Sequence, residues 1–294
     1  MPTNDRHEPS PVSEAAPAIC ADLHIHTTAS DGCWTPRQVV AGCRTVGIGL
    51  LAVADHDTVA HVLCTERLAQ AAGLGFLRAV EVSTTADGRL IHILGYGIDP
   101  TDADLGRLLT ENRASLDAAG EEDIRGLIEL GYAINLDAYH AYSYDRTRGG
   151  FKSLNFCIDV GIAQDVRDFF ENTRRLVARP LPDFAHPATA IDAIRGAGGV
   201  PVLAHPGASF ADLGGVTAAA LAPLLAQGIA GLECYSQYHD AATTAFCVAW
   251  CRGHDLTITG GSDYHGGYVG RQLGVPIIGA DQLQLPSKLW PPAG

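Results

Sequence analysis

Two short motifs in the sequence each place two metal-ligating side chains two positions apart. His24 and His26 form the first pair, and Asp263 and His265 form the second. In a β-strand, residues two positions apart point to the same face, so each pair can offer two ligand atoms to one cation. Imidazoles and carboxylates together suit divalent transition metals. Polar residues that cap a strand would explain one pair alone, but the repetition favours a metal site.

Further side chains of the same chemistry occur at or near the ends of short apolar segments. The complete set of candidate metal ligands is His24, His26, Asp31, His56, Glu81, His92, His205, Asp263 and His265. If Glu81 bridges two ions, this set supplies about ten ligand bonds, which suits three ions with four or five ligands each once water or substrate oxygens are added. A single ion would leave several of these histidines without a role. We therefore expect two to three divalent transition metals.

Structural roles stay open for individual members of this set. His92 lies within an apolar segment, where a hydrogen-bonded core histidine is more common than a ligand. Asp31 can cap a turn. Asp55 and Asp57 flank His56 and can orient neighbouring imidazoles without contacting a metal. Only the set as a whole indicates a metal centre.

Short apolar segments and longer helical segments alternate along the chain, which predicts repeated βα units. Strands are expected at 19–23, 48–54, 74–80, 90–95, 199–204, 229–232 and 256–259. A helix is expected over 36–46, because Thr35 can cap it and Pro36 suits its first turn. In parallel (βα) barrels the catalytic groups gather at the carboxyl ends of the strands, which is where most of the candidate ligands stand.

The alternation breaks between residues 101 and 189. Amphipathic segments at 105–116 and 124–130 and a charged helical segment at 164–177 predict a small helical insertion. The expected organisation is a flexible N-terminal tail at 1–18, a barrel domain at 19–100 and 190–294, and the helical insertion at 101–189.

Composition and charge restrict the classes of partner. The 294 residues include 20 Lys and Arg against 33 Asp and Glu, a formal net charge of -13, which argues against a general basic face for a nucleic acid polymer. No apolar run reaches the length of a membrane span, so no membrane partner is expected. The eight cysteines lack metal-type spacing and the first 18 residues lack a signal peptide, which predicts free thiols and a cytoplasmic protein. The oligomeric state stays open.

Taken together, the motifs resemble the PHP (polymerase and histidinol phosphatase) family of metal-dependent phosphoesterases. The resemblance covers residues 20–100 and 195–270 and rests on His24-Ile-His26, Ser30-Asp31-Gly32, Thr35-Pro36, Ala54-Asp55-His56-Asp57-Thr58, Glu81, His92-Ile-Leu-Gly-Tyr-Gly97, Ala204-His205-Pro206-Gly207 and Ser262-Asp263-Tyr264-His265. It implies an α/β fold, a distorted (βα)7 TIM-like barrel, and a trinuclear centre of Mn, Fe or Zn. It also implies a division of the ligands: His24, His26 and Glu81 with Asp263 or His265 around one ion, Asp31, His56 and His205 around a second, and Glu81, His92 and the remaining partner around a third.

The resemblance also implies a reaction and a class of substrate. A hydroxide that bridges two ions would attack a phosphate ester of a small phosphorylated sugar or nucleotide, with no side-chain nucleophile. One branch of the family carries a Gly-Arg-Pro-His-Ile-Ala-Arg-like stretch in the insertion, whereas residues 146–155 here read RTRGGFKSLN. This stretch looks closer to hydrolases of phosphoribosyl cyclic phosphates, so a cyclic phosphate diester, cleaved at one or both ester bonds, is the first expectation. A nucleotide phosphatase acting on 3′,5′-bisphosphates or mononucleotides is the second.

Individual roles follow from these expectations. The predicted catalytic residues are His205, Asp263, His265 and His239, and the predicted substrate-binding residues are Arg148, Lys152, Asn155, Tyr235 and Arg271. Arg and Lys are chosen because they bind phosphate oxygens. The leaving oxygen needs a general acid, for which Tyr235, His239, Tyr264 and a metal-bound water all stay open.

Two other classes of protein compete with the phosphoesterase. Amidohydrolases also use a His-x-His pair at a barrel strand end, but they usually need a bridging lysine, and Lys152 and Lys288, the two lysines of this chain, both lie away from predicted strand ends. A non-catalytic metal-binding barrel predicts the loss of ligands, whereas all the expected ligands are present.

Overall fold

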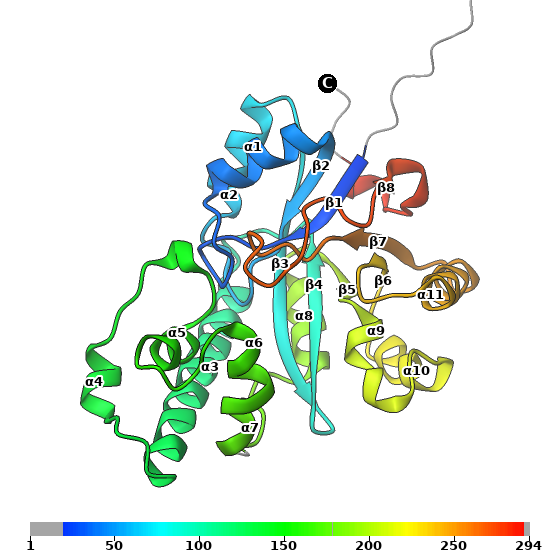
Figure 1. Ribbon diagram of the computed structural model, residues 1–294. Coiled ribbons are helices and arrows are strands. Elements are labelled where there is room, and N and C mark those ends of the chain that lie inside the picture. Colours follow the sequence, from blue (N-terminus) through cyan, green and yellow to red (C-terminus); the bar gives the residue numbers. More distant parts are fainter. Residues whose placement is uncertain (1–19, 178, 291–294) are drawn as a thin grey trace, which may run out of the picture.

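The computed structural model describes residues 20–177 and 179–290, so the predicted tail at 1–18 lies outside the described residues. Within them, eight strands form one sheet that curves into a nearly closed barrel (Figure 1). The strands are β1 (Cys20–Ile25), β2 (Ile48–Val53), β3 (Gly75–Ala86), β4 (Arg89–Tyr96), β5 (Val200–Leu203), β6 (Gly231–Ser236), β7 (Thr257–Gly261) and β8 (Ile278–Gly279). Their order in the sheet is β7-β6-β5-β4-β3-β2-β1-β8. Just beyond β7, Tyr264 pairs with Ile25 of β1, which brings the two sides of the barrel together.

The predicted fold class, a distorted TIM-like α/β barrel, is confirmed, and the distortion has a clear local cause. β4 runs antiparallel to both β3 and β5, and β8 runs antiparallel to β1. Only Asp87 and Gly88 connect β3 to β4, and both have left-handed backbones with φ of 51° and 72°. Two residues can close a hairpin, but a parallel connection needs a crossover of a dozen residues or more.

Six helices of the described chain belong to the barrel: α1 (Pro36–Val46), α2 (Val62–Ala71), α8 (Pro187–Gly196), α9 (Pro206–Ser209), α10 (Ala218–Ala226) and α11 (Ala241–Gly253). The helix predicted over 36–46 is confirmed as α1. It begins where the Gln38 side chain accepts a hydrogen bond from the Thr35 backbone N–H at 2.9 Å, with Pro36 at its first position. It ends at Gly47, whose φ of 80° suits glycine.

A group of helices between β4 and α8 lies beside one side of the barrel (Figure 1). It consists of α3 (Ala103–Glu129), α4 (Leu136–Ala141), the 3₁₀ turn η1 (Arg146–Arg148), α5 (Lys152–Asp159), α6 (Val166–Asp168), the π-helical turn η2 (Phe169–Thr173) and α7 (Arg174–Val177). These helices have a buried core of their own that includes Leu127, Phe156 and Phe169. The two amphipathic segments predicted at 105–116 and 124–130 are parts of one helix, α3, because no proline interrupts the residues between them. No helix in the described residues is long and apolar enough to cross a membrane.

The barrel interior is apolar below the end that carries the polar side chains. Leu23, Leu50, Leu94 and Val202 come from four different strands and pack in one buried cluster. Tyr96 lies in the same cluster and donates a hydrogen bond from its hydroxyl to the Leu23 carbonyl at 2.9 Å. This packed layer closes the barrel, so the candidate ligands stand on a rigid floor.

Candidate metal centre

The structure brings the nine predicted ligands together at one end of the barrel. They come from β1 and the loop after it, the loop after β2, the middle of β3, β4, and the ends of β5 and β7: His24, His26, Asp31, His56, Glu81, His92, His205, Asp263 and His265. Glu81 and His92 differ from the rest, because they stand within strands of the hairpin. Residues far apart in sequence thus meet at a single mouth, where a (βα) barrel gathers its functional groups.

Glu81 lies at the centre of this cluster and is fully buried. Its two carboxylate oxygens lie within 3.3 Å of a ring nitrogen of each of five histidines, His24, His26, His56, His92 and His205. Two of the three groups of donors that could each hold one ion contain Glu81. It is therefore the residue best placed to bridge two cations.

The first donor group consists of His24, His26, Glu81 and Asp263, all buried. Nε2 of His26 lies 2.9 Å from Oδ1 of Asp263, and Nε2 of His24 lies 3.0 Å from Oε2 of Glu81. This group matches one alternative for the first ion, the one with Asp263 as the fourth ligand. Two imidazoles and two carboxylates are a donor set suited to Mn, Fe or Zn.

The other two groups differ from the division that the family resemblance implied. Asp31 joins His26, His56 and His265, with its Oδ2 at 3.3 Å from Nε2 of His265. His205 instead places its Nε2 at 3.0 Å from Oε1 of Glu81. The reason is directional, because His205 follows β5, next to β4 and away from β1 and β2 in the sheet.

The third group contains Glu81, His56 and His92. Nδ1 of His92 lies 3.0 Å from Oε1 of Glu81, the same oxygen that faces His205. His92 is therefore part of the cluster and does not act as an isolated core histidine. We place His205 with this group because the imidazoles of His92 and His205 contact the same oxygen, Oε1 of Glu81.

Several buried atoms of the cluster have no hydrogen-bond partner. They are both ring nitrogens of His26, Nδ1 of His92, Nδ1 of His205 and Oδ1 of Asp263. Buried polar atoms in proteins are nearly always satisfied, so unpaired atoms at a site of this composition need another partner. Cations between the imidazoles and carboxylates would satisfy most of them, and the residues present therefore fit a multinuclear divalent metal centre.

The carboxylates of this cluster favour the ionised state despite their burial. Burial raises the pKa of Glu81, but the neighbouring imidazoles outweigh it and hold that pKa well below its usual range. Burial lowers the pKa of His26, but the adjacent carboxylates of Asp263 and Glu81, at 2.9 and 3.3 Å from its Nε2, outweigh it and raise that pKa to about 10. Protons thus bind tightly where cations would bind, which is the behaviour expected of a site built for positive charge.

Neighbouring carboxylates hold the loops that carry the ligands. Asp55 accepts hydrogen bonds from the Thr27 backbone N–H at 2.7 Å, the Thr27 hydroxyl at 2.7 Å and the Ser30 hydroxyl at 2.6 Å. Asp57 accepts from the backbone N–H of Ser83 and the side-chain amide of Asn112. These contacts support a supporting role for both aspartates.

Asp22 likewise holds the backbone beside a candidate ligand, here Asp263. Its carboxylate accepts hydrogen bonds from the Ser262 backbone N–H at 2.9 Å, the Ser262 hydroxyl at 2.6 Å and the Gly274 backbone N–H at 2.9 Å. Asp263 follows directly and has a left-handed backbone with φ of 50°. Such a conformation persists only when its surroundings hold it, so Asp22 helps to fix Asp263 in place.

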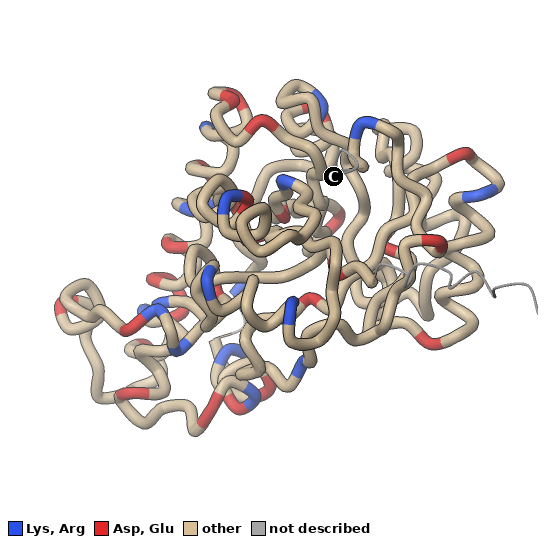
Figure 2. The backbone as a smooth tube through the Cα atoms, turned by 90° about the horizontal axis from the view of Figure 1, so that it is seen from above, with Lys and Arg blue, Asp and Glu red and all other residues tan. Residues whose placement is uncertain are grey.

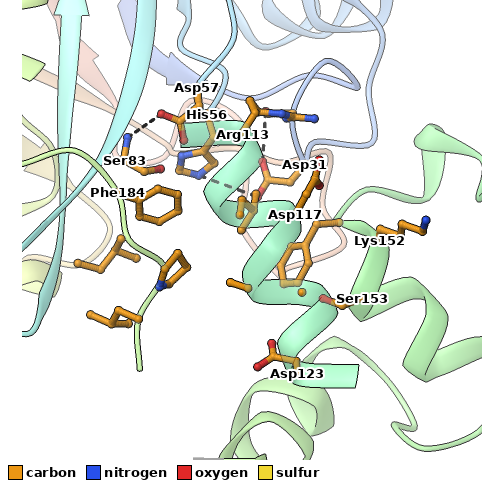
Figure 3. Close-up of a pocket in the computed structure, with 18 of the residues that line it drawn as sticks. Asp31, His56, Asp57, Ser83, Arg113, Asp117, Asp123, Lys152, Ser153 and Phe184 are labelled. Atoms are coloured by element: carbon orange, nitrogen blue, oxygen red, sulfur yellow. Dashed lines mark hydrogen bonds and ion pairs between the residues drawn. The ribbon is translucent and has the colours of Figure 1, made fainter. Parts of the chain in front are cut away.

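Three residues predicted to bind substrate are occupied elsewhere in the insertion. Arg148 makes two hydrogen bonds with Asp159, at 2.7 and 2.8 Å. The side chain of Asn155 donates to the carbonyls of Gly149 and Phe151 and so supports a turn. Lys152 donates to a backbone carbonyl and extends away from Asp31 and His56 (Figure 3). In this structure the side chains of Arg148, Asn155 and Lys152 thus bind protein groups, and their predicted roles in substrate binding stay predictions.

The residues predicted for the β6 side of the mouth also contact protein groups. Tyr235 packs against the apolar clusters of the barrel wall. His239 is engaged through both ring nitrogens, Nδ1 with the Cys234 carbonyl at 2.9 Å and Nε2 with the Gly207 backbone N–H at 3.0 Å. It therefore has no free nitrogen for acid–base catalysis. Tyr264, the remaining side-chain candidate for the general acid, is largely buried against the Trp34 ring, at 4.9 Å between centroids.

Arg271 reaches the cluster but binds the protein there. Its guanidinium donates to the side chain of Asp263 at 2.5 Å and to the Asp263 backbone carbonyl at 2.9 Å. It also contacts Tyr238, whose hydroxyl donates to the same Asp263 carboxylate at 3.2 Å. In this structure Arg271 thus binds a candidate metal ligand, and its predicted role in substrate binding stays a prediction. Sequence reasoning missed Tyr238, because nothing in its local pattern distinguishes it from Tyr235.

A cavity of about 250 Å³ lies between the metal cluster and the helical insertion. Asp31, His56 and His92 line one end, and aromatic and aliphatic side chains, including Phe184, line the wall that faces α3 (Figure 3). Its cationic residues are Arg113, Arg146, Lys152 and Arg174. Sequence reasoning missed Arg113 and Arg146, although Arg146 lies only two positions from the predicted Arg148.

Comparison with known proteins gives a consistent family. No protein-family model matches the chain. The 3′,5′-nucleoside bisphosphate phosphatase of Chromobacterium violaceum is 32% identical over 279 residues, covering 86% of this chain and 90% of that protein. The 5′-3′ exoribonuclease Rnm of Escherichia coli (strain K12) is 31% identical over 309 residues, covering 96% and 94%. The phosphoribosyl 1,2-cyclic phosphate 1,2-diphosphodiesterase of Eggerthella lenta is 30% identical over 267 residues, covering 88% and 97%.

A solved structure agrees with these relatives. A protein from Bifidobacterium adolescentis, described as a metal-dependent phosphoesterase, superposes with a TM-score of 0.77 at 27% identity, covering 90% of this chain and 94% of that one. This chain belongs to the PHP-like family of metal-dependent phosphoesterases. The resemblance seen in the sequence is confirmed, and the PHP-like chain is an enzyme of the phosphoesterase class.

One of the similar solved structures is described as an amidohydrolase, the alternative class of enzyme. A Chromobacterium violaceum structure described as an amidohydrolase with bound sulfate superposes with a TM-score of 0.70 at 25% identity, covering 92% of this chain and 93% of that one. In the PHP-like chain, however, both lysines lie away from the donor cluster. The Lys152 ammonium contacts the His140 carbonyl and the Lys288 ammonium contacts the Gly198 carbonyl. Neither is placed to bridge two metals.

Proposed function

We propose that this enzyme hydrolyses a phosphate ester of a ribonucleotide, with the nucleobase held in the cavity beside the metal cluster. The observation that supports this proposal is the position of the cavity. It is lined by three candidate ligands at one end and by apolar, partly aromatic side chains along its wall. Ligand pockets of this kind combine apolar walls with a few polar groups that fix orientation. The reacting phosphate would lie at the ligand end and the base against the wall.

The roles of the residues follow from their positions. The nine predicted ligands would hold two to three divalent ions of Mn, Fe or Zn, arranged in the three donor groups described above. Bound divalent ions activate water and neutralise the negative charge of phosphate oxygens during hydrolysis. Arg113 and Arg146 line the cavity and would bind a phosphate that does not react, because guanidinium groups present paired donors to phosphate oxygens. Arg146 also donates to the Ser30 carbonyl and the Tyr144 hydroxyl, which hold its guanidinium beside the loop that carries Asp31.

The relatives support a ribose phosphate as the common element of the substrate. Their names refer to a nucleoside bisphosphate, to RNA and to a phosphoribosyl cyclic phosphate. The apolar wall favours a substrate that carries a base, since a phosphoribosyl cyclic phosphate has no ring to pack against the apolar side chains that line the cavity, which include Phe184, Phe151 and Phe170. We therefore place the nucleotide above the cyclic phosphate, which reverses the order expected from the sequence.

A second candidate is the stepwise removal of nucleotides from the 5′ end of RNA. The likeness to the Escherichia coli exoribonuclease over nearly the whole chain favours it. A polymer bound along its length usually needs a continuous basic surface. In the backbone view of Figure 2, the positions of basic and acidic residues are interspersed along the chain. This distribution supports a short substrate, or a terminal nucleotide, over an extended strand.

A substrate panel tests the proposal. Enzyme loaded with Mn²⁺ would be given adenosine 3′,5′-bisphosphate, a phosphoribosyl 1,2-cyclic phosphate and a short 5′-phosphorylated oligoribonucleotide, and the products would be quantified. We expect the bisphosphate to have a kcat/KM at least about tenfold above that of the cyclic phosphate, a difference of about 1.4 kcal/mol. A cyclic phosphate with the higher kcat/KM would contradict the proposal, and efficient shortening of the oligoribonucleotide would favour the second candidate.

A variant of the apolar wall sharpens this test. Phe184→Ala removes a ring whose stacking on a base is worth about 1–3 kcal/mol, so KM for the bisphosphate should rise about 5- to 100-fold with little change for a substrate without a base. Phe246→Ala is the matched control, because Phe246 packs against the barrel core outside the cavity. Equal effects of Phe184→Ala on both substrates would contradict the placement of the base in the cavity.

A further inference from the structure

A fully buried carboxylate on β6, that of Glu233, contacts two of the candidate ligands without being one itself. Oε1 of Glu233 lies 3.0 Å from Nδ1 of His24. Oε2 accepts a hydrogen bond from the backbone N–H of His205 at 2.7 Å. Each oxygen is thus committed to a different ligand residue, one on β1 and one after β5. None of the candidate donor groups in the described residues includes Glu233.

The contact with His24 determines which ring nitrogen faces the cluster. A carboxylate at Nδ1 favours a proton on that nitrogen, which leaves the lone pair of a neutral imidazole on Nε2. Nε2 of His24 is the atom that points to Oε2 of Glu81, at 3.0 Å, and to Oδ1 of Asp263, at 3.4 Å. Glu233 therefore presents His24 to the first donor group in the state that a metal ligand needs.

The contact with His205 acts on the backbone. His205 has φ of 26° and ψ of 60°, a left-handed conformation that residues with a side chain rarely adopt. Such a conformation is retained only when neighbouring groups hold it. The bond to Glu233 fixes the amide of this residue, and the resulting turn aims Nε2 of His205 at Oε1 of Glu81, 3.0 Å away.

We infer that Glu233 is a positioning residue that couples His24 and His205 and so sets the affinity of the metal centre. This inference rests on the metal centre of the proposed function and extends it to a residue outside the predicted ligands. One side chain orients the imidazole of one ligand and the backbone of another, and the two imidazoles face different oxygens of Glu81. Loss of Glu233 should therefore loosen two metal positions at once. Outer partners of this kind typically change metal affinity or activity by about 10- to 100-fold.

The test compares Glu233→Gln with a matched control. Glutamine keeps the volume but can accept only one of the two hydrogen bonds, because its amide nitrogen would face a second donor. Glu66→Gln is the control, since Glu66 is a partly buried carboxylate that pairs with Arg78 on the barrel exterior. Mn²⁺ affinity would be measured by titration of the purified full chain, together with the melting temperature. We expect Glu233→Gln to weaken Mn²⁺ binding about 10- to 100-fold, and Glu66→Gln to leave it within about twofold of wild type, as expected for a change outside the metal site.

A spectroscopic readout separates positioning from a general structural effect. In Zn²⁺-loaded protein labelled with ¹⁵N-histidine, the Nδ1 proton of His24 should be protected and shifted by the carboxylate in wild type, and this signal should move or broaden in Glu233→Gln. If Glu233→Gln does not fold, Glu233→Asp keeps the charge but shortens the side chain, and it should also lose metal affinity.

The outcomes distinguish this inference from the proposed function. Wild-type protein that binds no divalent metal would overturn both. Wild-type protein that binds metal, with a folded Glu233→Gln or Glu233→Asp variant of equal affinity and an unchanged His24 signal, would overturn the role of Glu233 and leave the metal centre standing.

Discussion

Replacing Glu81 with glutamine should disable the enzyme while leaving its fold intact. The substitution keeps the size of a fully buried side chain but removes one of the three carboxylate charges among the predicted ligands. Five imidazoles lie within 3.3 Å of this carboxylate, more than lie near either other carboxylate of the centre. Breaking a buried charge pair by removal of one partner costs about 3–5 kcal/mol, which corresponds to roughly 10²- to 10⁴-fold in affinity.

The assay measures metal content and turnover on the same preparation. After equilibration at a fixed concentration of free Mn²⁺, elemental analysis of Glu81→Gln should show the loss of at least one metal per chain relative to wild type. The value of kcat should fall by about 10²- to 10⁴-fold. Circular dichroism should show the wild-type secondary structure, and Glu66→Gln serves as the control. A folded Glu81→Gln protein with full metal content and near wild-type turnover would refute the assignment of Glu81 as a bridging ligand.

Three further predictions concern the ligands, the cavity and pH. His205→Ala should reduce turnover at least about 100-fold with an unchanged circular dichroism spectrum, and retained turnover would remove His205 from the centre. Arg146→Ala should raise KM for a bisphosphate by about tenfold or more, since bonds to charged groups contribute about 1.5–3 kcal/mol, whereas Arg148→Ala should not, and the reverse order of effects would contradict the cavity assignment. Because the pKa of His26 is raised to about 10, a bound proton must leave when a cation binds. Mn²⁺ affinity should therefore increase as pH rises from about 6 to about 9, and calorimetric titration that shows no such increase would contradict this linkage.

The clustering of the nine candidate ligands could be predicted from the sequence because it depends on local patterns. His24 and His26 share a face by strand periodicity, and the end of each apolar segment marks the mouth of the barrel. The division of the set could not be predicted, since it depends on how neighbouring strands aim their side chains. His205 faces Glu81 because β5 lies next to β4, whereas Asp31 reaches His265 through the loop after β1.

The substrate side was harder to predict because its residues act through tertiary contacts. Arg146 and Arg148 are two cations in one 3₁₀ turn, and only the fold shows that Asp159 takes the second. Both ring nitrogens of His239 bind backbone groups, the Cys234 carbonyl and the Gly207 amide, and neither hydrogen bond can be recognised from the sequence. No local pattern distinguishes a free side chain from an occupied one.

The elements of the fold were largely accessible, with two instructive exceptions. The Asp87-Gly88 turn is a recognisable hairpin signal, and reading it as such would have predicted that β4 runs antiparallel. The long helix α3 was divided in two because its apolar positions are interrupted near Gly120. Glycine within a helix weakens a prediction, but tertiary packing of α3 against α8 and α5 overrides that preference.

Anomalous diffraction from crystals grown with Mn²⁺ would test most directly whether these distant side chains share one set of cations. The account predicts two or three anomalous peaks within bonding distance of the three donor groups. Two of these peaks should flank the Glu81 carboxylate, one on each side. Crystals with full Mn²⁺ exposure and no peak at these side chains, or with peaks only on the outer surface, would contradict it.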